Sequence, residues 1–280
     1  MKDALVIISH YNAWPATQLV SLLDQMREIP AGHPFRARIV VNQAEDKPLE
    51  LPERHRGIDV FYRENVGYNI GAWDHGWKQE PKADFYLFLQ EECVILRPGW
   101  LRDFIRAASD PRVGLVGESL ELWQQTWEQI DYYRDLAGNV PMTVFGRDCS
   151  WSEANRMFLD KHGIRAGSGS DHLQSLILGM RGDVLEKIGG FPLGVTKDEA
   201  ICSEVAISKA VQALGLRIRQ VGLRRFTRIH HPQWEAERAE SHRIGWMVGR
   251  AFETYLPSTN RRVRGTLSSL KGKVRGLHHR

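Results

Sequence analysis

The sequence has few cysteines and no long hydrophobic run. Its three cysteines, Cys93, Cys149 and Cys202, are an odd number without CxxC spacing, so neither a disulfide framework nor a zinc site is expected. No apolar run approaches the ~18 residues of a membrane span. The run at 4–8 is short and follows an acidic residue, unlike a signal peptide. We therefore expect a cytoplasmic protein.

Basic charge is concentrated at the C-terminal end. The formal net charge is +4, yet the residues from Arg261 onward contain seven Lys and Arg and no acid. Because the rest of the chain has no basic face interleaved with aromatic residues, nucleic acid is not an expected partner. The 280 residues contain no internal repeat, and 42% hydrophobic residues suffice for a large core.

What the chain does contain is an alternation of apolar runs and helical patterns. Leu19, Leu22, Leu23 and Met26 recur at helical spacing between two apolar runs. Such runs predict strands at 4–9, 38–41, 57–62, 85–89, 113–116, 172–180 and 216–221, and helices are predicted at 101–108, 182–188 and 204–214. This order predicts an α/β fold with a mostly parallel sheet flanked by helices.

One strand runs directly into a polar cluster. Residues 85–89 are all apolar and are followed by Gln90, Glu91 and Glu92. In open α/β sheets, ligands collect outside the carboxyl ends of the strands. Because strand side chains alternate, we expect Gln90 and Glu92 on one side and Glu91 on the other. These residues are therefore candidates for holding a metal or a charged ligand, although they could also cap a strand at the surface.

Several motifs in a fixed order resemble the family 2 glycosyltransferases. The loop at 65–72 resembles the family's NxGxxxGA loop and is closest to rhamnan-synthesis-type transferases. The other matches are the first strand at 6–12, the DxD strand at 88–92 with a trailing PGWL at 98–101, the GGFP segment at 188–192 and the ED helix at 203–208. Together they cover roughly residues 4–231, and their order makes the resemblance specific.

The resemblance implies a GT-A fold, a Rossmann-like, mostly parallel sheet flanked by helices. Residues 1–235 would form the transferase domain, with a nucleotide-sugar half at 1–117 and an acceptor half at 118–235. Residues 236–280 would form a helical basic extension. The implied reaction moves a sugar from a nucleotide-sugar donor to a glycan or lipid-linked acceptor, in surface polysaccharide synthesis and with inversion.

The resemblance also assigns residues to the donor. Those expected to bind it are Ser9, Tyr11, Asn42, Arg63, Asn65, Gly67, Gln90 and Glu91. Asn42 stands where the family usually has an acid that touches the base, so the identity of the base stays open.

The implied cofactor is Mg²⁺ or Mn²⁺, held by a depleted motif. Glu92 matches the last acid of DxD, but Gln90 replaces the first acid and supplies no charge. Such ions keep waters and use the phosphates of the substrate as ligands, so one or two carboxylates can suffice. A histidine after the last strand often completes the site in this family, and His230, next to His231, is the expected second ligand. Arg63 is the candidate if a cationic side chain replaces the metal.

Glu204 is the expected general base, because it matches the acid of the ED helix. Placed at the start of its helix, it would have its pKa lowered by the helix dipole. Ser203 replaces the first acid of that motif. Asp198 and Glu199, a few residues upstream, are the alternatives if the register of the motif match is different.

Two other functions and one surface remain open. A nucleotidyltransferase would need a Gly-rich, basic phosphate loop after the first strand, where residues 9–12 have none. A non-catalytic relative that binds glycan or a partner is supported by Gln90 and Ser203, each of which lacks an expected acid. Residues 241–280 begin with an amphipathic pattern and turn basic, which predicts either peripheral contact with the inner face of a membrane or a docking helix.

Overall fold

The computed structural model describes the chain except residues 2, 122–124, 137–140 and 242–280. The prediction of a membrane contact at 241–280 therefore lies almost entirely outside the described residues. Among the helices that are described, none has the length and apolar character needed to cross a membrane.

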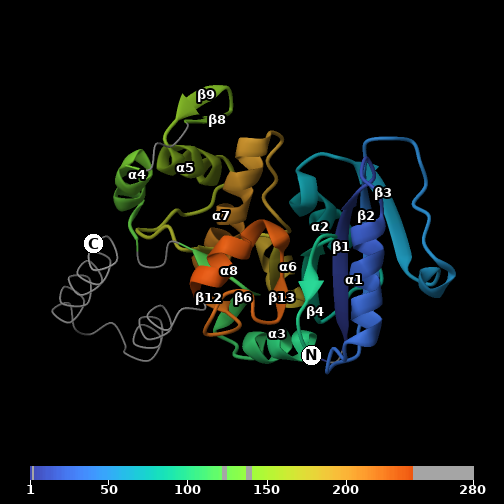
Figure 1. The fold of residues 1–280 in the computed structure, drawn as a ribbon. Helices are drawn as coiled ribbons and strands as arrows, with labels where there is room; N and C mark the ends of the chain where they lie inside the picture. The colour runs from blue at the N-terminus through green and yellow to red at the C-terminus, as the bar shows by residue number, and fades with distance from the viewer. Residues whose placement is uncertain (2, 122–124, 137–140, 242–280) are drawn as a thin grey trace, which may run out of the picture.

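A seven-stranded sheet with the order β12-β6-β11-β4-β1-β2-β3 forms the centre of the molecule (Figure 1). Its strands are β1 (Ala4–Tyr11), β2 (Arg36–Gln43), β3 (Asp59–Glu64), β4 (Phe85–Gln90), β6 (Val113–Gly117), β11 (Ile177–Arg181) and β12 (Arg217–Gln220). Of these, β11 runs antiparallel to both neighbours, β4 and β6, and the other pairs are parallel. The prediction of a mostly parallel sheet flanked by helices is confirmed.

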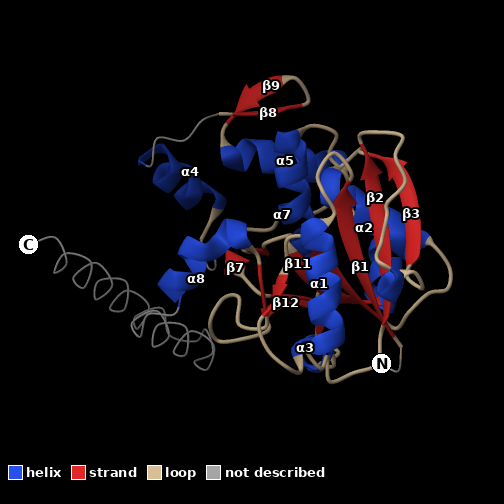
Figure 2. Ribbon diagram, turned by 45° about the vertical axis from the view of Figure 1, so that its right-hand side comes forward, coloured by secondary structure: helices blue, strands red, loops and turns tan. Residues whose placement is uncertain are grey.

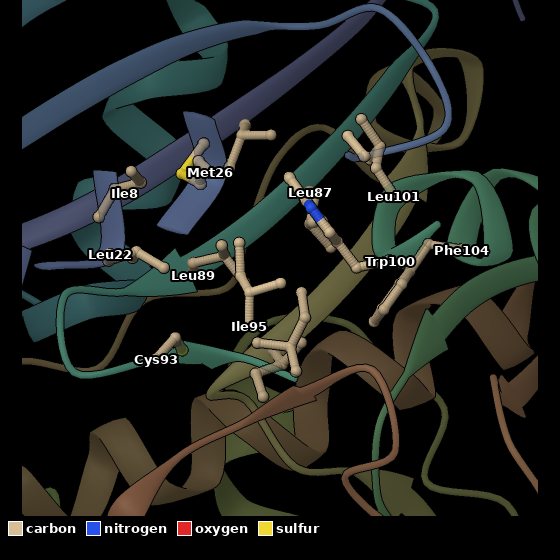
Figure 3. Close-up of a cluster of buried hydrophobic side chains, with 14 of the residues drawn as sticks. Ile8, Leu22, Met26, Leu87, Leu89, Cys93, Ile95, Trp100, Leu101 and Phe104 are labelled. Atoms are coloured by element: carbon tan, nitrogen blue, oxygen red, sulfur yellow. The ribbon is translucent and has the colours of Figure 1, made fainter. Parts of the chain in front are cut away.

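The alternation of side chains along β1 divides the core between two helical layers. Val6 and Ile8 pack against α1 (Thr17–Glu28) and α3 (Trp100–Ala108), in the cluster drawn in Figure 3. Leu5 and Ile7 belong to the opposite cluster, with α2 (Tyr68–Lys78), α6 (Gly182–Ile188) and α7 (Lys197–Ala213). Figure 2 shows α1 and α2 on opposite faces of the sheet. Because both faces are covered, the strands are apolar runs rather than alternating patterns.

The predicted strand at 172–180 is wrong as one element. Residues in this region form β10 (His172–Leu173), which pairs with β7 (Leu120–Glu121), and then the sheet strand β11. The three residues between β10 and β11 are polar or form a turn, and apolar content alone did not reveal the break.

Smaller elements complete the described chain. Helices α4 (Trp127–Leu136) and α5 (Trp151–Lys161) and the hairpin of β8 (Met142–Val144) and β9 (Arg147–Cys149) lie together at one end, beside α7 (Figure 1). A two-stranded ladder joins β5 (Val94–Ile95) to β13 (Ile229–His230). Short 3₁₀ turns occupy Glu53–His55 and Pro232–Trp234, and α8 (Glu235–Ser241) ends the described chain.

Candidate active site

The carboxyl ends of β1 and β4 are joined by a buried carboxylate. Glu91 is 3% exposed, its Oε2 lies 2.5 Å from His10 Nδ1, and its Oε1 accepts a hydrogen bond from the Tyr11 backbone N–H at 3.0 Å. Ser9 Oγ donates to the Leu89 carbonyl at 3.4 Å. Both side chains were expected to bind the donor. In this structure their polar atoms connect the carboxyl ends of the two strands and fix the position of these ends relative to each other.

Gln90 and Glu92 lie on the other side of the chain, as the alternation of side chains predicts. His231 Nε2 lies 2.9 Å from Gln90 Oε1 and 3.7 Å from Glu92 Oε2. Burial raises the pKa of Glu92, but the neighbouring His231 imidazole outweighs it, so that the pKa lies below its ordinary value. These three side chains form a small polar cluster in which Glu92 is the charged member.

The structure brings His231, rather than His230, to this cluster. His230 Nε2 lies 2.8 Å from Glu235 Oε2, at the start of α8. Its other ring nitrogen, Nδ1, is buried and has no hydrogen-bond partner in the described part of the chain. Adjacent residues in β structure point in opposite directions. This explains why two neighbouring histidines face different elements, and why sequence alone could not choose between them.

The polar cluster offers a divalent cation few protein ligands. The described residues contain no group of three or more His, Cys, Asp or Glu side chains that could hold a metal. The Glu92 carboxylate, the His231 imidazole and the Gln90 amide oxygen are nevertheless ligand types that Mg²⁺ or Mn²⁺ accepts. The set fits only an ion that also takes ligands from water and from phosphate.

Asn42 and Arg63 brace the Gly-rich loop between β3 and α2. Arg63 donates from Nη1 to Asn42 Oδ1 at 2.7 Å and from Nη2 to the Val66 carbonyl at 2.6 Å. Asn42 Nδ2 donates to the Tyr68 carbonyl at 2.9 Å. A Cβ atom at Gly71 would lie 2.1 Å from the Val66 carbonyl oxygen, so the loop closes only around a glycine. Asn42 and Arg63 were predicted to bind the donor, and in this structure their side chains hold the Gly-rich loop in place.

One hydrogen-bond acceptor in this loop has no partner among the described residues. Asn65 Oδ1 is buried and has no hydrogen-bond partner among the described residues. Gly67 (φ +75°) and Tyr68 (φ +52°) both adopt left-handed backbone, which turns the chain sharply into α2. A buried acceptor without a partner costs free energy unless a ligand donates to it, and Asn65 is a predicted donor-binding residue.

Two aromatic rings, one of them exposed, lie next to the end of β1. Tyr11 and Trp14 pack edge to face with ring centroids 5.8 Å apart, and Trp14 is 55% exposed. Tyr11 was a predicted donor-binding residue, whereas Trp14 was not. The signal that could have identified Trp14 is its place in the turn that follows the first strand, at the edge where ligands collect.

Glu204 lies in the middle of α7, not at its start. The helix begins at Lys197, behind a capping box in which Thr196 Oγ1 accepts from the Glu199 N–H and the Glu199 carboxylate accepts from the Thr196 N–H. The expectation that the helix dipole acts on Glu204 is therefore wrong, because that effect falls off within the first turn.

The alternatives to Glu204 are engaged with backbone groups. The Asp198 carboxylate accepts from the Thr143 N–H at 2.7 Å. The Glu199 carboxylate accepts from the Val195 N–H at 2.8 Å and from the Phe145 N–H at 3.3 Å. Both acids thus fix the start of α7 and the β8–β9 hairpin.

The Glu204 carboxylate is held by two side chains from the β10–β11 segment. Ser175 Oγ donates to Oε2 at 2.6 Å, and His172 Nε2 lies 3.4 Å from Oε1. His172 Nδ1 lies 3.0 Å from the Ser170 carbonyl, so both ring nitrogens face acceptors. Burial raises the pKa of Glu204, but the contacts with His172 and Ser175 outweigh it and set the pKa below its ordinary value. Sequence reasoning missed both His172 and Ser175.

The register of the sheet brings Glu204, His172 and Ser175 to the same edge as Glu92. Ile177 of β11 pairs with Leu89 of β4 in antiparallel register, so the residues before Ile177 lie beside those after Leu89. Cys93 Sγ contacts the Leu176 carbonyl at 3.7 Å, which confirms that the two segments run side by side. Ser175, which contacts Glu204, is therefore at the carboxyl end of β4.

Glu118 is a further residue that sequence reasoning missed. This carboxylate is fully buried at the carboxyl end of β6 and accepts from the backbone N–H groups of Thr227, Arg228 and Ile229 at 2.8, 2.9 and 3.0 Å. The segment that it holds leads directly to His231. The available signal was an acid two residues after the strand predicted at 113–116.

Comparisons with known proteins found structural neighbours of low sequence identity. No protein-family model and no curated protein matches the chain. A mannosyltransferase from Pyrobaculum calidifontis, in complex with GDP-Man and Mn²⁺, superposes with a TM-score of 0.45 at 16% identity over 78% of this chain and 54% of that chain. The S. aureus TarS 1–349 fragment with UDP-GlcNAc gives 0.42 at 15% identity over 74% and 53%.

A CMP:2-keto-3-deoxy-manno-octonic acid synthetase complexed with CTP gives a TM-score of 0.40 at 13% identity over 78% of this chain and 88% of that chain. The similarity is remote. This chain spans about half the length of the mannosyltransferase and of the TarS fragment.

Proposed function

We propose that the protein is a GT-A-type glycosyltransferase that uses a nucleotide-sugar donor and inverts the anomeric centre. The observation that supports this most is the braced Glu204 carboxylate at the same sheet edge as Gln90, Glu92 and His231. The Glu204 carboxylate is suited to take a proton. The cluster of Gln90, Glu92 and His231 is suited to accommodate a diphosphate. The resemblance of the motif order to family 2 glycosyltransferases gives the same assignment.

In the proposed reaction, Glu204 takes the proton of the acceptor hydroxyl. The acceptor oxygen forms a bond to the anomeric carbon from the side opposite the leaving group. The bond between that carbon and the diphosphate oxygen breaks, and the nucleoside diphosphate leaves with the electron pair. A glycan or lipid-linked sugar in surface polysaccharide synthesis is the acceptor class that we propose.

The donor would lie along the ends of β1 to β4. Tyr11 and Trp14 offer aromatic faces to the base, and Asn65 Oδ1 offers the unpaired acceptor in the Gly-rich loop. Glu92 and His231, with Gln90, would hold Mg²⁺ or Mn²⁺, which supplies neutralisation of the charge that develops on the leaving diphosphate. The protein contributes little charge of its own there, so the ion would depend on the donor phosphates for binding.

The nucleotidyltransferase alternative is less well supported. Such an enzyme needs a Gly-rich, basic loop after the first strand to hold triphosphate. Residues 9–16 contain neither glycine nor a basic residue other than His10, which is engaged by Glu91.

The decisive experiment combines nucleotide binding with turnover. Thermal shifts with UDP, GDP and dTDP, with and without Mn²⁺, would identify the base, and turnover of matching nucleotide sugars would follow. Glu204→Gln should leave the nucleotide shift unchanged and lower kcat by about 10²–10⁴-fold, the usual contribution of a general base. Glu186→Gln is the matched control, since Glu186 is exposed and lines a pocket at the opposite edge of the sheet.

Two results would count against the proposal. Turnover that survives Glu204→Gln would remove Glu204 as the base. Nucleotide binding by the wild-type protein without turnover of any donor would instead favour the non-catalytic relative, for which the replacement of an acid by Gln90 is the best support.

A further inference from the structure

A second pocket, away from the cluster around Glu92, is lined by arginines. It has a volume of about 530 Å³, and Arg97, Arg224, Arg228 and Arg238 contribute to its walls together with the Thr227 hydroxyl group. It lies at the end of the β5–β13 ladder, where the Leu96 N–H donates to the Arg228 carbonyl at 2.9 Å. The proposed transfer reaction uses none of these side chains.

Positive charge exceeds negative charge around this pocket. Arg228 Nε lies 2.5 Å from Asp103 Oδ2, but Arg102 and Arg106 also contact that carboxylate, at 3.4 and 3.2 Å. One carboxylate is thus shared by three guanidinium groups, of which Arg228 lines the pocket.

The other pocket arginines add to this excess. Arg238 lies 3.3 Å from Glu235, which also contacts His230. Arg97 is exposed and makes no ion pair with any residue in the described part of the chain. The nearby carboxyl group of Glu118 is buried beneath the loop, with its oxygens taken up by backbone N–H groups. The Arg97 guanidinium group is therefore available to an anion in this pocket.

Guanidinium groups and a hydroxyl group in one pocket are suited to phosphate. Arginine binds phosphate oxygens through two parallel N–H bonds, and a hydroxyl group donates to a further oxygen. The rim adds an apolar feature, since Leu96 and Leu223 both line the pocket and are 36% and 51% exposed. Exposed leucines beside arginines are typical of surfaces that meet the boundary between lipid headgroups and acyl chains.

The sequence beyond the pocket has the same character. Arg238 belongs to α8, the last described helix, and the chain continues from there to the segment from Arg261 onward, which contains seven Lys and Arg and no acid. Basic segments next to a membrane-facing site raise its occupancy by anionic lipids. We propose that the arginine pocket binds the phosphate headgroup of an anionic membrane lipid, with Leu96 and Leu223 against the acyl region. This is independent of the proposed transfer activity.

The test measures binding of the full-length protein to vesicles. Vesicles of equal parts phosphatidylcholine and phosphatidylglycerol are compared with pure phosphatidylcholine in a flotation assay. Arg97→Ala should weaken binding to the anionic vesicles about fivefold, the factor that corresponds to ~1 kcal/mol for one basic residue near an anionic surface. Arg147→Ala removes the same charge from the β8–β9 hairpin, so any general electrostatic contribution of the basic C-terminal segment cancels between the two variants.

A second pair of measurements separates a lipid from a soluble phosphate. Leu223→Ser should weaken vesicle binding and leave binding of inorganic pyrophosphate, measured by calorimetry, unchanged. Equal vesicle binding by Arg97→Ala and Arg147→Ala would overturn the proposal. So would pyrophosphate binding that depends on Arg97 together with vesicle binding that does not, since the ligand would then be a free phosphate compound. Because Arg97 and Leu223 are exposed, neither substitution is expected to impair folding, and melting temperatures check this.

Discussion

The protonation of Glu204 depends on a balance of opposing contributions. Burial favours the neutral acid, whereas the contacts with His172 and Ser175 favour the carboxylate and outweigh burial. A carboxylate kept ionised at low pH is always available to accept a proton, but it is a weaker base than one with a higher pKa.

Replacing His172 should therefore move the pH dependence of transfer. In the wild-type protein, the acidic limb of kcat/KM should lie below 4.5, the ordinary pKa of a glutamate. His172→Asn removes the imidazole that lowers the pKa of Glu204, so this pKa rises and the acidic limb moves to higher pH. A pH profile of kcat/KM for both proteins checks this.

His162→Asn is the matched control, because His162 lies at the end of α5 against Phe158 and has no contact with Glu204. A limb that stays in place in His172→Asn, with activity retained, would show that the imidazole does not set the pKa of Glu204.

At the scale of elements, the Gly-rich loop is held in one conformation by hydrogen bonds that cross it. Arg63 crosses it to Asn42 and Val66, and Asn42 reaches back to Tyr68. The path of the loop leaves no room for a side chain at Gly71, where a Cβ would meet both the Val66 carbonyl and Arg63 Nη1, 2.8 Å away. Arg63, Asn42 and Gly71 therefore fix the path of the loop together.

Gly71→Ala should open this loop. Since the Cβ would contact backbone, the loop must shift, and we expect a loss of ~1–3 kcal/mol in the free energy of unfolding together with weaker nucleotide binding. Gly57→Ala is the control, because a Cβ at Gly57 meets nothing within 4 Å. Chemical denaturation and nucleotide thermal shifts measure the two effects. Unchanged nucleotide binding in a destabilised Gly71→Ala would separate the loop from the donor site.

The start of helix α7 is marked in the sequence by a capping box. Thr196 and Glu199 have the spacing of a capping box, which marks the helix start from sequence alone. The match of Ser203 and Glu204 to the ED motif favoured a later start. The general-base assignment of Glu204 stays a prediction, but its electrostatic environment comes from β10 and the turn after it rather than from the end of a helix.

At the scale of the whole molecule, one sheet spans both predicted halves of the transferase domain. Strand β11 of the second half lies between β4 and β6, which both belong to the first half. A Cβ at Gly179, in the middle of β11, would lie 2.7 Å from Phe85 Cζ and 2.9 Å from Val116 Cγ2. The junction of the halves is therefore packed without spare space.

Gly179→Ala should destabilise both halves together. We expect a loss of ~1–3 kcal/mol from overpacking, with hydrogen exchange rising in peptides from β4 and β6 of the first half as well as from β11 and β12 of the second half. Gly57→Ala again provides the control. Faster exchange confined to β11 and β12 would show that residues 1–117 and 118–235 are separate folding units.

The sequence by itself determined the strands that carry the site. Runs of apolar residues required burial on both faces, which predicts a covered, mostly parallel sheet, and the alternation of side chains placed Gln90 and Glu92 together. It also identified Asn65 and Glu204 as candidates. These features depend on local pattern, which a chain carries before it folds.

Only the tertiary structure decided which long-range partners meet. It chose His231 over His230, joined Glu91 to His10 across two strands, and brought His172 and Ser175 to Glu204. It also placed Glu118 under the segment that leads to His231. The physical reason is that such contacts join residues far apart in sequence, whose approach is set by the register of β11 against β4 and by the packing of α7, and no local pattern records either.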